Sequence, residues 1–226
     1  MKPSPETALL AREIHCRLNQ LTVPSTPTVR AIRKEFSQRI AAAAPKSVVQ
    51  LALHLLKQNS DLLRFLSYEL VSRHQPAFEQ LTTADLLKLG KGLNSWSAVD
   101  CFAMYLSGPL WVHGTVSDQT IAAWACSKDR WWRRTALVST VALSRRGHSE
   151  DLRRVLQTCA LLTVDRDDMV VKALSWALRE SAKKHPEEVS TFLVEHSHAL
   201  AARVVREVNS KLKTGLKTPR RRTQKP

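Results

Sequence analysis

A succession of helical patterns joined by short connections constrains this chain more than any other feature. Apolar residues recur at helical spacing, and no stretch shows the alternation typical of a β-strand. Helices are expected over residues 5–19, 28–43, from 45 onward, 60–74, 82–91, 95–107, 117–127, 129–146, 149–161, 167–184, 186–196 and 198–213. Short connections between such helices favour hairpins that stack side by side. The predicted fold class is therefore all-α.

Composition and helix-start signals agree with this prediction. The 226 residues include only six glycines, the first of them Gly90, and Leu and Ala outnumber Val and Ile. Breaks in the apolar pattern coincide with residues that favour helix starts, namely Thr26, Thr82, Ser95, Ser117, Asp129, Ser149 and Pro186. The expected boundaries thus rest on backbone chemistry as well as on hydrophobic periodicity.

The charge of the chain predicts an acidic partner. The net charge is +15, and nucleic acid is the first candidate, because a basic surface gains affinity by releasing phosphate counterions. Seven Lys or Arg residues follow Val208 without an acid among them, which leaves +8 on the rest of the chain. We expect a HEAT-like helical repeat domain over residues 1–214 and a basic, disordered tail over residues 215–226.

Other classes of protein are disfavoured. The cysteines are far apart in sequence, and three of them lie in apolar helical patterns, which suits buried free thiols in a reducing compartment. No pair of Cys or His has the spacing of zinc ligands, so neither a metal nor a cofactor is expected. No apolar run approaches the length of a membrane span, and the N-terminus lacks an apolar signal core. We expect a cytoplasmic monomer that does not associate with membranes.

Trp96 and Asp100 form the first candidate site. They are four residues apart on one expected helix, and such residues are neighbours on the same face. At about 100° per residue, this face also includes Ala103 and Ser107. The opposite, core-facing side would hold Ala98, Phe102, Tyr105 and Leu106. Trp96 and Asp100 are thus predicted to face away from the core, although an isolated pair of this kind is more often an ordinary part of the surface.

Basic stripes on two later helices favour a functional role for Trp96 and Asp100 over an ordinary surface position. The expected helix at 129–146 is apolar almost all round, apart from a narrow stripe of Arg130, Arg134 and Arg145. Such arginines can pair with acids of a neighbouring helix, but three on one stripe without an adjacent acid favour phosphates. The helix at 167–184 carries a stripe of Lys172, Trp176, Arg179 and Lys183. A tryptophan in a basic stripe is unusual for a core residue, so Trp176 is predicted to face a ligand. The tryptophans predicted to pack in the interior are Trp111, Trp124, Trp131 and Trp132.

The stripes recur at a regular interval. Trp96 and Arg134 are 38 residues apart, and Arg134 and Trp176 are 42 apart, close to the roughly 40-residue unit of HEAT-type repeats. One period later, the last helix carries Arg203, Arg206, Ser210 and Lys213. Equivalent helices of successive repeats line one surface of a solenoid. The prediction is a HEAT-like α-solenoid of stacked antiparallel helix pairs with a concave basic face.

These residues resemble the AlkD-like DNA alkylation repair glycosylases, an all-helical HEAT-like family. The resemblance covers about residues 20 to 212, and its blocks follow the order and spacing of the family. The blocks are Ser95-Trp96 with Val99-Asp100, Trp131-Trp132-Arg133-Arg134-Thr135-Ala136, and Lys172-Ala173 with Trp176 and Leu178-Arg179-Glu180. The segment Val23-Pro24-Ser25-Thr26-Pro27, followed by Arg30, is similar to the opening of the family but lacks its preceding glycine, and Ser175 stands where a glycine is common.

The resemblance implies a function and a site. Asp100 would be the catalytic aspartate, Trp96 and Trp176 its aromatic partners, and Arg134 the active-site arginine. The implied activity is that of a monofunctional DNA glycosylase, which hydrolyses the N-glycosidic bond of cationic alkylated purines in duplex DNA during base excision repair. The residues expected to bind DNA are Arg130, Arg133, Lys172, Arg179, Lys183, Arg203 and Arg206.

A single carboxylate suits this chemistry. Glycoside hydrolysis usually needs two carboxyl groups, one of which protonates the leaving group. A purine methylated at ring nitrogen 3 or 7 already carries positive charge, so it can leave without an acid. One carboxylate is then enough to stabilise the oxocarbenium-like sugar, and tryptophan π faces attract the cationic nucleotide.

Two other functions are consistent with the sequence. Solenoids bind more often than they catalyse, so a non-catalytic HEAT-like nucleic-acid-binding scaffold is the main alternative. A protein-interaction solenoid with an acidic partner is the third. The combination of Asp100, Trp96, Arg134 and Trp176 favours the enzyme, because a surface that only binds phosphates gains nothing from a carboxylate.

Overall fold

The computed structural model describes residues 5–146 and 148–218. The chain divides into two compact units, Met1–Leu110 and Trp111–Pro226. The described residues form helices and no strand, and most helices pack on their neighbours within their unit. The predicted all-α, solenoid-like fold is therefore confirmed, whereas the concave basic face stays a prediction.

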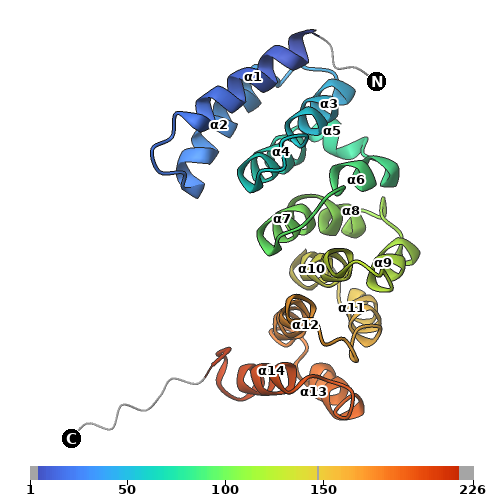
Figure 1. Ribbon diagram of the computed structural model, residues 1–226. Coiled ribbons are helices and arrows are strands. Elements are labelled where there is room, and N and C mark those ends of the chain that lie inside the picture. The colour runs from blue at the N-terminus through green and yellow to red at the C-terminus, as the bar shows by residue number, and fades with distance from the viewer. Residues whose placement is uncertain (1–4, 147, 219–226) are drawn as a thin grey trace, which may run out of the picture. The chain divides into compact units, whose positions relative to one another are not determined.

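The first unit is organised around one central helix, α4 (Asp61–Arg73), which is buried from Leu63 to Val71 except at the half-buried Phe65. It packs against α2 (Thr26–Arg39), α3 (Pro45–Leu55) and α7 (Trp96–Phe102) (Figure 1). The other elements of this unit are α1 (Pro5–Asn19), α5 (Gln75–Glu79), α6 (Thr83–Leu89) and the π-helical turn η1 (Ala103–Ser107). A short helix, α8 (Gly108–Val112), follows η1 across the division between the units.

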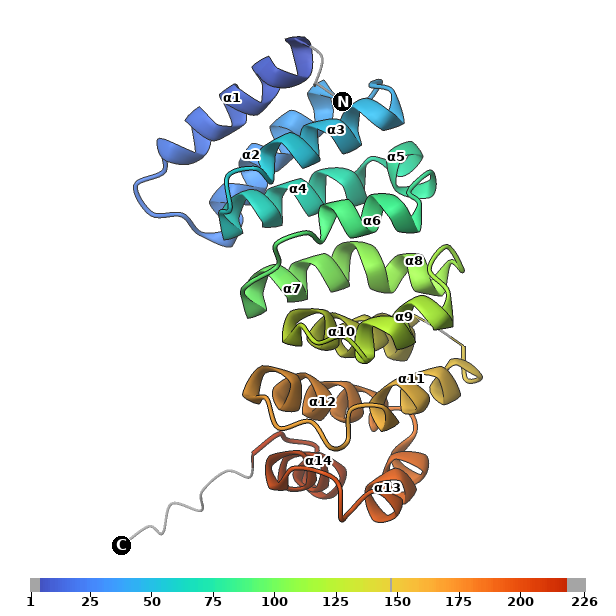
Figure 2. The same ribbon diagram turned by 45° about the vertical axis from the view of Figure 1, so that its right-hand side comes forward.

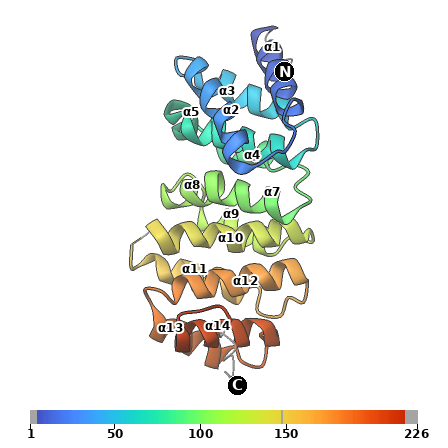
Figure 3. The same ribbon diagram turned by 90° about the vertical axis from the view of Figure 1, so that its left-hand side faces the viewer.

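The second unit is organised around α10 (Arg130–Arg146), which packs against α9 (Asp118–Ala125), α11 (Asp151–Ala160) and α12 (Asp168–Ser181). Neighbours on several sides explain why α10 is buried in all directions from Arg134 to Leu143, as its apolar sequence predicted. The unit ends with α13 (Pro186–Glu195) and α14 (Ala202–Thr214), and α14 packs on α12. Figures 2 and 3 show α10, α12 and α14 as successive layers.

Most of the predicted helix ends lie within a few residues of those observed. The caps predicted at Thr82, Ser95 and Ser117 are confirmed, because each side chain accepts a backbone N–H of the first turn. Two predicted caps are wrong. Ser25, not Thr26, caps α2, since its hydroxyl accepts the N–H of Thr28, and Ser149 makes no cap because Glu150 directly precedes α11. The short helices α5 and α8 were not predicted, because one or two turns carry too little periodicity.

The cysteines are free, but their burial differs from the prediction. Cys159 is buried and Cys101 is half-buried, whereas Cys16 and Cys126 are exposed. Cys126 lies just beyond the last residue of α9 and is exposed, so its apolar surroundings in sequence are not its surroundings in space.

The described part of the chain contains no helix long and apolar enough to cross a membrane. Helix α14 ends at Gly215, whose φ of 72° is the left-handed conformation that glycine adopts readily. The predicted tail begins at this residue, and its residues 219–226 lie outside the described part of the structure.

Candidate nucleic-acid interface

The start of α7 is held by the start of α4. The Ser95 hydroxyl accepts the N–H of Ala98 at 3.1 Å and donates to a carboxylate oxygen of Asp61 at 2.8 Å. Ser97 donates to the same carboxylate. Trp96 lies between these two serines and is 58% exposed. Its ring thus projects from a fixed helix terminus, as the sequence predicted for this residue.

The loop before α7 is also anchored to α4. Arg64 is 2% exposed, and its Nη2 donates to the carbonyl oxygens of Lys91 at 3.2 Å and Gly92 at 2.7 Å. Its Nη1 donates to the hydroxyl of Tyr68 at 3.1 Å. Gly92 adopts a φ of 72°, which brings its carbonyl to the guanidinium. The chain therefore enters α7 from a rigid loop.

Asp100 lies half-exposed on α7, directly after the buried residues Ala98 and Val99. The predicted continuation of its face is wrong, because Ala103 and Ser107 are completely buried. Met104 and Tyr105 are half-exposed instead. The π-helical turn η1 accounts for Ser107 and Tyr105, since a π-turn adds one residue and changes the register of the side chains within and after it. Ala103 is the first residue of this turn, so the change of register does not explain its burial.

A network of charged residues that the sequence analysis did not identify reaches Tyr105, five residues after Asp100. Glu69 is completely buried and accepts hydrogen bonds from Arg30 Nε at 2.9 Å and Arg33 Nε at 3.2 Å. Arg30 Nη2 also donates to the hydroxyl of Tyr105 at 2.9 Å. The hydrogen bond to Glu69 raises the pKa of Arg30. Arg30 in the opening motif was the only signal of this network, because its partners lie 39 and 75 residues away.

The electrostatic surroundings of Cys101 include Asp100 and two members of this network, Glu69 and Arg30. Burial raises the pKa of the Cys101 thiol to about 12, and the negative charges of Asp100 and Glu69 add to the effect. The positive charge of Arg30 acts in the opposite direction. The thiol therefore lies within electrostatic range of both the candidate carboxylate and Arg30, and it stays protonated at neutral pH.

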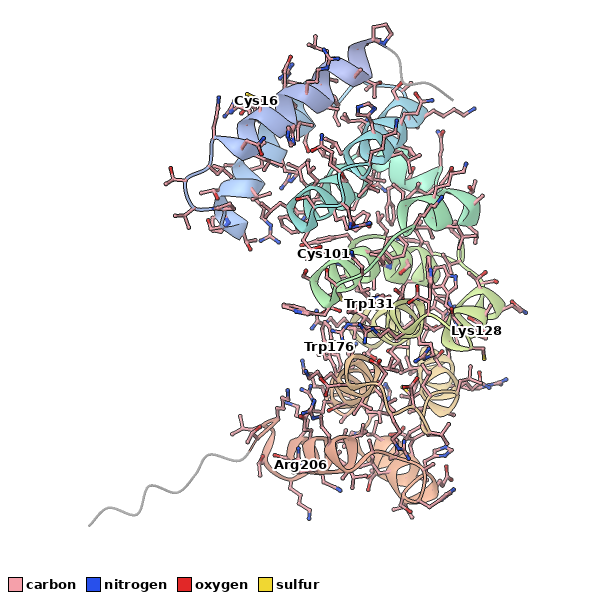
Figure 4. The ribbon with its side chains drawn as sticks, in the orientation of Figure 1. Cys16, Cys101, Lys128, Trp131, Trp176 and Arg206 are labelled. Atoms are coloured by element: carbon pink, nitrogen blue, oxygen red, sulfur yellow. The ribbon has the colours of Figure 1, made fainter. Side chains whose placement is uncertain are left out.

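In the second unit, Trp176 is half-exposed while Leu174 and Leu178 on the same helix are buried. This agrees with its predicted position opposite the core. Figure 4 shows Trp176 at the left, with α12, and Lys128 at the right, beside α9. Arg134 is only 5% exposed, and its Nη1 donates to the carbonyl oxygen of Met169 at 2.6 Å. This bond ties α10 to the first turn of α12.

The predicted stripe of arginines without an adjacent acid is wrong. Arg130 pairs with Asp167 at 3.3 Å, and Arg145 pairs with Glu180 at 3.0 Å. Asp167 directly precedes α12, and Glu180 lies on it. The other candidate cations also have carboxylates nearby. These pairs are Arg133–Asp165, Lys172–Asp168, Arg179–Glu207, Lys183–Glu180 and Arg203–Asp168. Among the described residues Arg206 has no such partner, and it is exposed on α14.

These pairs place much of the basic charge beside acids on the same unit. Lys172 lowers the pKa of Asp168 through a hydrogen bond. Burial tends to raise the pKa of Glu180, but hydrogen bonds from Arg145 and Lys183 outweigh it, so the net change is downward. Burial lowers the pKa of Arg179. A polyanion would therefore meet cations that already have oriented partners.

The remaining tryptophans are mostly packing residues, as predicted. Trp111 and Trp124 are buried, and the half-exposed Trp132 packs against Trp124 with ring centroids 4.9 Å apart and the rings tilted by 42°. Trp131 is also half-exposed and differs because the guanidinium of Arg130 lies over its ring, 4.8 Å from the centroid. Within the described ranges no group of three or more His, Cys, Asp or Glu side chains is placed to hold a metal ion.

Comparison with known proteins relates this geometry to a family. The family model described as DNA alkylation repair enzyme matches residues 4–212. The chain belongs to this family. The matched range includes all four candidate site residues, namely Trp96, Asp100, Arg134 and Trp176.

One solved structure supports the family assignment at the level of the fold. It is described as a predicted DNA alkylation repair enzyme from Enterococcus faecalis, with 17% sequence identity and a TM-score of 0.69. The similarity covers 95% of this chain and 98% of that chain. No curated protein matches the chain.

Proposed function

We propose that this member of the DNA alkylation repair enzyme family is a monofunctional DNA glycosylase. Its substrate would be duplex DNA that contains cationic purines such as 3-methyladenine or 7-methylguanine. The observation that carries the proposal is a half-exposed carboxylate, Asp100, on the same short helix as a 58% exposed tryptophan, Trp96, in a chain of net charge +15. The reaction needs no cofactor and no second copy of the chain.

Asp100 would act on charge that develops during bond cleavage. As the bond between the sugar and the cationic base breaks, positive charge moves to the sugar, and a nearby carboxylate stabilises it. The same carboxylate can orient the water that attacks the sugar. The exposed ring of Trp96 would attract the cationic nucleotide through its π face. The half-exposed ring of Trp176 is proposed to do the same, and Arg134 is proposed to hold Trp176 in place through the start of α12.

Replacing Asp100 by Asn tests this function. The change keeps the shape of the side chain and removes its charge. We expect release of methylated purine from duplex DNA to fall by roughly 100-fold or more, the scale of losing one preorganised electrostatic group. Affinity for duplex DNA should stay equal or rise slightly, because a negative charge is removed. Single-turnover base release and fluorescence anisotropy would measure the two quantities.

A matched control is Glu79→Gln, which removes the same charge from an exposed position on α5 whose side chain contacts Gln75. It should leave base release unchanged. Equal rates for the wild-type protein and Asp100→Asn would exclude Asp100 as the catalytic group. Tight duplex binding by a wild-type protein that releases no base would instead identify a non-catalytic scaffold.

A further inference from the structure

We infer that Arg30, which contacts Tyr105 in the segment that follows Asp100, is a preorganised binding site for a backbone phosphate of DNA. The inference rests on the proposed action on duplex DNA and adds a residue to it. The guanidinium of Arg30 is held on several sides. Its Nε donates to Glu69 at 2.9 Å, its Nη2 donates to Tyr105 at 2.9 Å, and its central carbon lies 5.6 Å from the centroid of the Phe65 ring.

The charges of the cluster do not cancel. Glu69 carries one negative charge and pairs with both Arg30 and Arg33, so the three side chains together have a net charge of one positive unit. The Arg33 side chain is 11% exposed and the Arg30 side chain 45% exposed. Glu69 therefore does not neutralise both guanidinium groups, and of the two it is Arg30 whose charge reaches the surface.

Arg30 also keeps hydrogen-bond donors available. A guanidinium has five N–H groups, and those of Arg30 Nη1 have no hydrogen-bond partner among the described residues. A planar guanidinium with a fixed orientation suits a phosphate, which accepts two parallel hydrogen bonds. Because the side chain is already ordered, binding costs little side-chain entropy.

Tyr105 connects this site to the proposed reaction. It lies in η1, five residues after Asp100, and its ring packs edge-on against Phe65 with centroids 6.0 Å apart. Regular helical spacing predicts a core-facing Tyr105, whereas the π-turn leaves it half-exposed with its hydroxyl on Arg30. The segment that carries the carboxylate thus also orients the arginine. A phosphate held by Arg30 would lie near the sugar on which Asp100 acts.

Arg30→Gln tests the inference through the salt dependence of binding to an unmethylated duplex. The loss of one phosphate contact should reduce the log–log slope of affinity against salt by about 1. Affinity near 0.1 M salt should fall on the order of tenfold, as for one charge-assisted hydrogen bond. The variant should unfold in urea as one cooperative species, because Arg33 still pairs with Glu69.

Two further variants separate phosphate binding from a structural role. Arg39→Gln removes a cation of similar exposure from the same helix, where Glu13 is its carboxylate partner at 2.6 Å, and it should leave the slope unchanged. Tyr105→Phe removes only the hydroxyl that orients Arg30. It should weaken binding about threefold with the slope unchanged, since the charge remains.

Equal slopes for Arg30→Gln, Arg39→Gln and the wild-type protein would overturn the inference and leave Arg30 as a structural partner of Glu69. That result together with normal release of methylated purine would leave the glycosylase proposal intact. A reduced slope for Arg30→Gln in a protein that releases no base would support the phosphate site and reject the glycosylase.

Discussion

At the scale of single residues, the carboxylate that pairs with each cation decides how much of its charge is available to DNA. The position of a cation in the sequence does not reveal this partner. Glu180 is 8% exposed and accepts hydrogen bonds from Arg145 at 3.0 Å and Lys183 at 2.8 Å. Both cations were predicted to be free for phosphates. Their shared carboxylate lowers the positive potential that they can offer to DNA, and it also links α10 to α12.

The Glu180 pair has a predictable pH dependence. A carboxyl group whose pKa is lower in the folded protein stabilises it above the unfolded pKa of about 4.3, and this stabilisation is lost as pH falls through the folded pKa. Glu180→Gln should therefore cost about 1 kcal/mol in free energy of unfolding at pH 7, and much less at pH 3. Urea unfolding at the two pH values measures this. Glu187→Gln, at an exposed position on α13, should have little effect at either pH. An equal loss for Glu180→Gln at pH 7 and pH 3 would contradict the assignment.

At the scale of secondary structure elements, the α7 segment depends on the loop that precedes it. Gly92 and Gly114 both have positive φ, 72° and 78°. Only Gly92 has a close neighbour, since a Cβ there would lie 3.2 Å from Arg64 Nη2, whereas nothing lies within 4 Å of one at Gly114. The two glycines therefore share a backbone conformation but differ in packing.

Alanine at each glycine separates these effects. Gly114→Ala should cost about 1 kcal/mol in unfolding free energy, the strain of a left-handed residue. Gly92→Ala should cost more, about 2 kcal/mol, because Arg64 must move away from the carbonyl of Gly92. It should also slow release of methylated purine, since Trp96 begins the helix after this loop. Urea unfolding of both variants measures the difference, and equal losses would show that Arg64 accommodates the methyl group.

At the scale of the whole molecule, the net charge of +15 coexists with extensive internal pairing. Non-specific attraction to DNA depends on the net charge, whereas an individual phosphate contact needs a cation whose charge and N–H donors are not fully taken up by a neighbouring acid. By this criterion Arg206 is the strongest of the cations predicted to bind DNA, because the other candidates have carboxylates nearby in the described residues.

Duplex binding should accordingly weaken steeply with salt, with a log–log slope of several units, and Arg206→Ala should reduce that slope by about 1. Lys128→Ala is the matched control, since Lys128 is also exposed but lies beside α9, away from Trp176 (Figure 4). Anisotropy titrations at several salt concentrations measure both slopes. Equal slopes for the two variants would show that Arg206 adds only net charge.

The sequence by itself determined the longer helices, the caps at Thr82, Ser95 and Ser117, and the exposure of Trp96 and Trp176. These features depend on periodicity and on side chains within a few residues, so local chemistry is sufficient to predict them. The same reasoning misplaced Ser107 and Tyr105, because a π-turn changes the register of the residues within and after it. It also misplaced Ala103, which begins that turn.

Only the tertiary structure decided which charges meet. Arg130 and Asp167 are 37 residues apart, and Arg30 and Tyr105 are 75 apart, so their contacts depend on how helices pack and not on spacing along one helix. Glu69 and Glu180 are buried in the folded protein, and a charge removed from water needs oriented partners. Each of these two carboxylates therefore pairs with specific cations. Helical periodicity reports which side of a helix faces the core, and it contains no information about the acid that a neighbouring helix brings to that side.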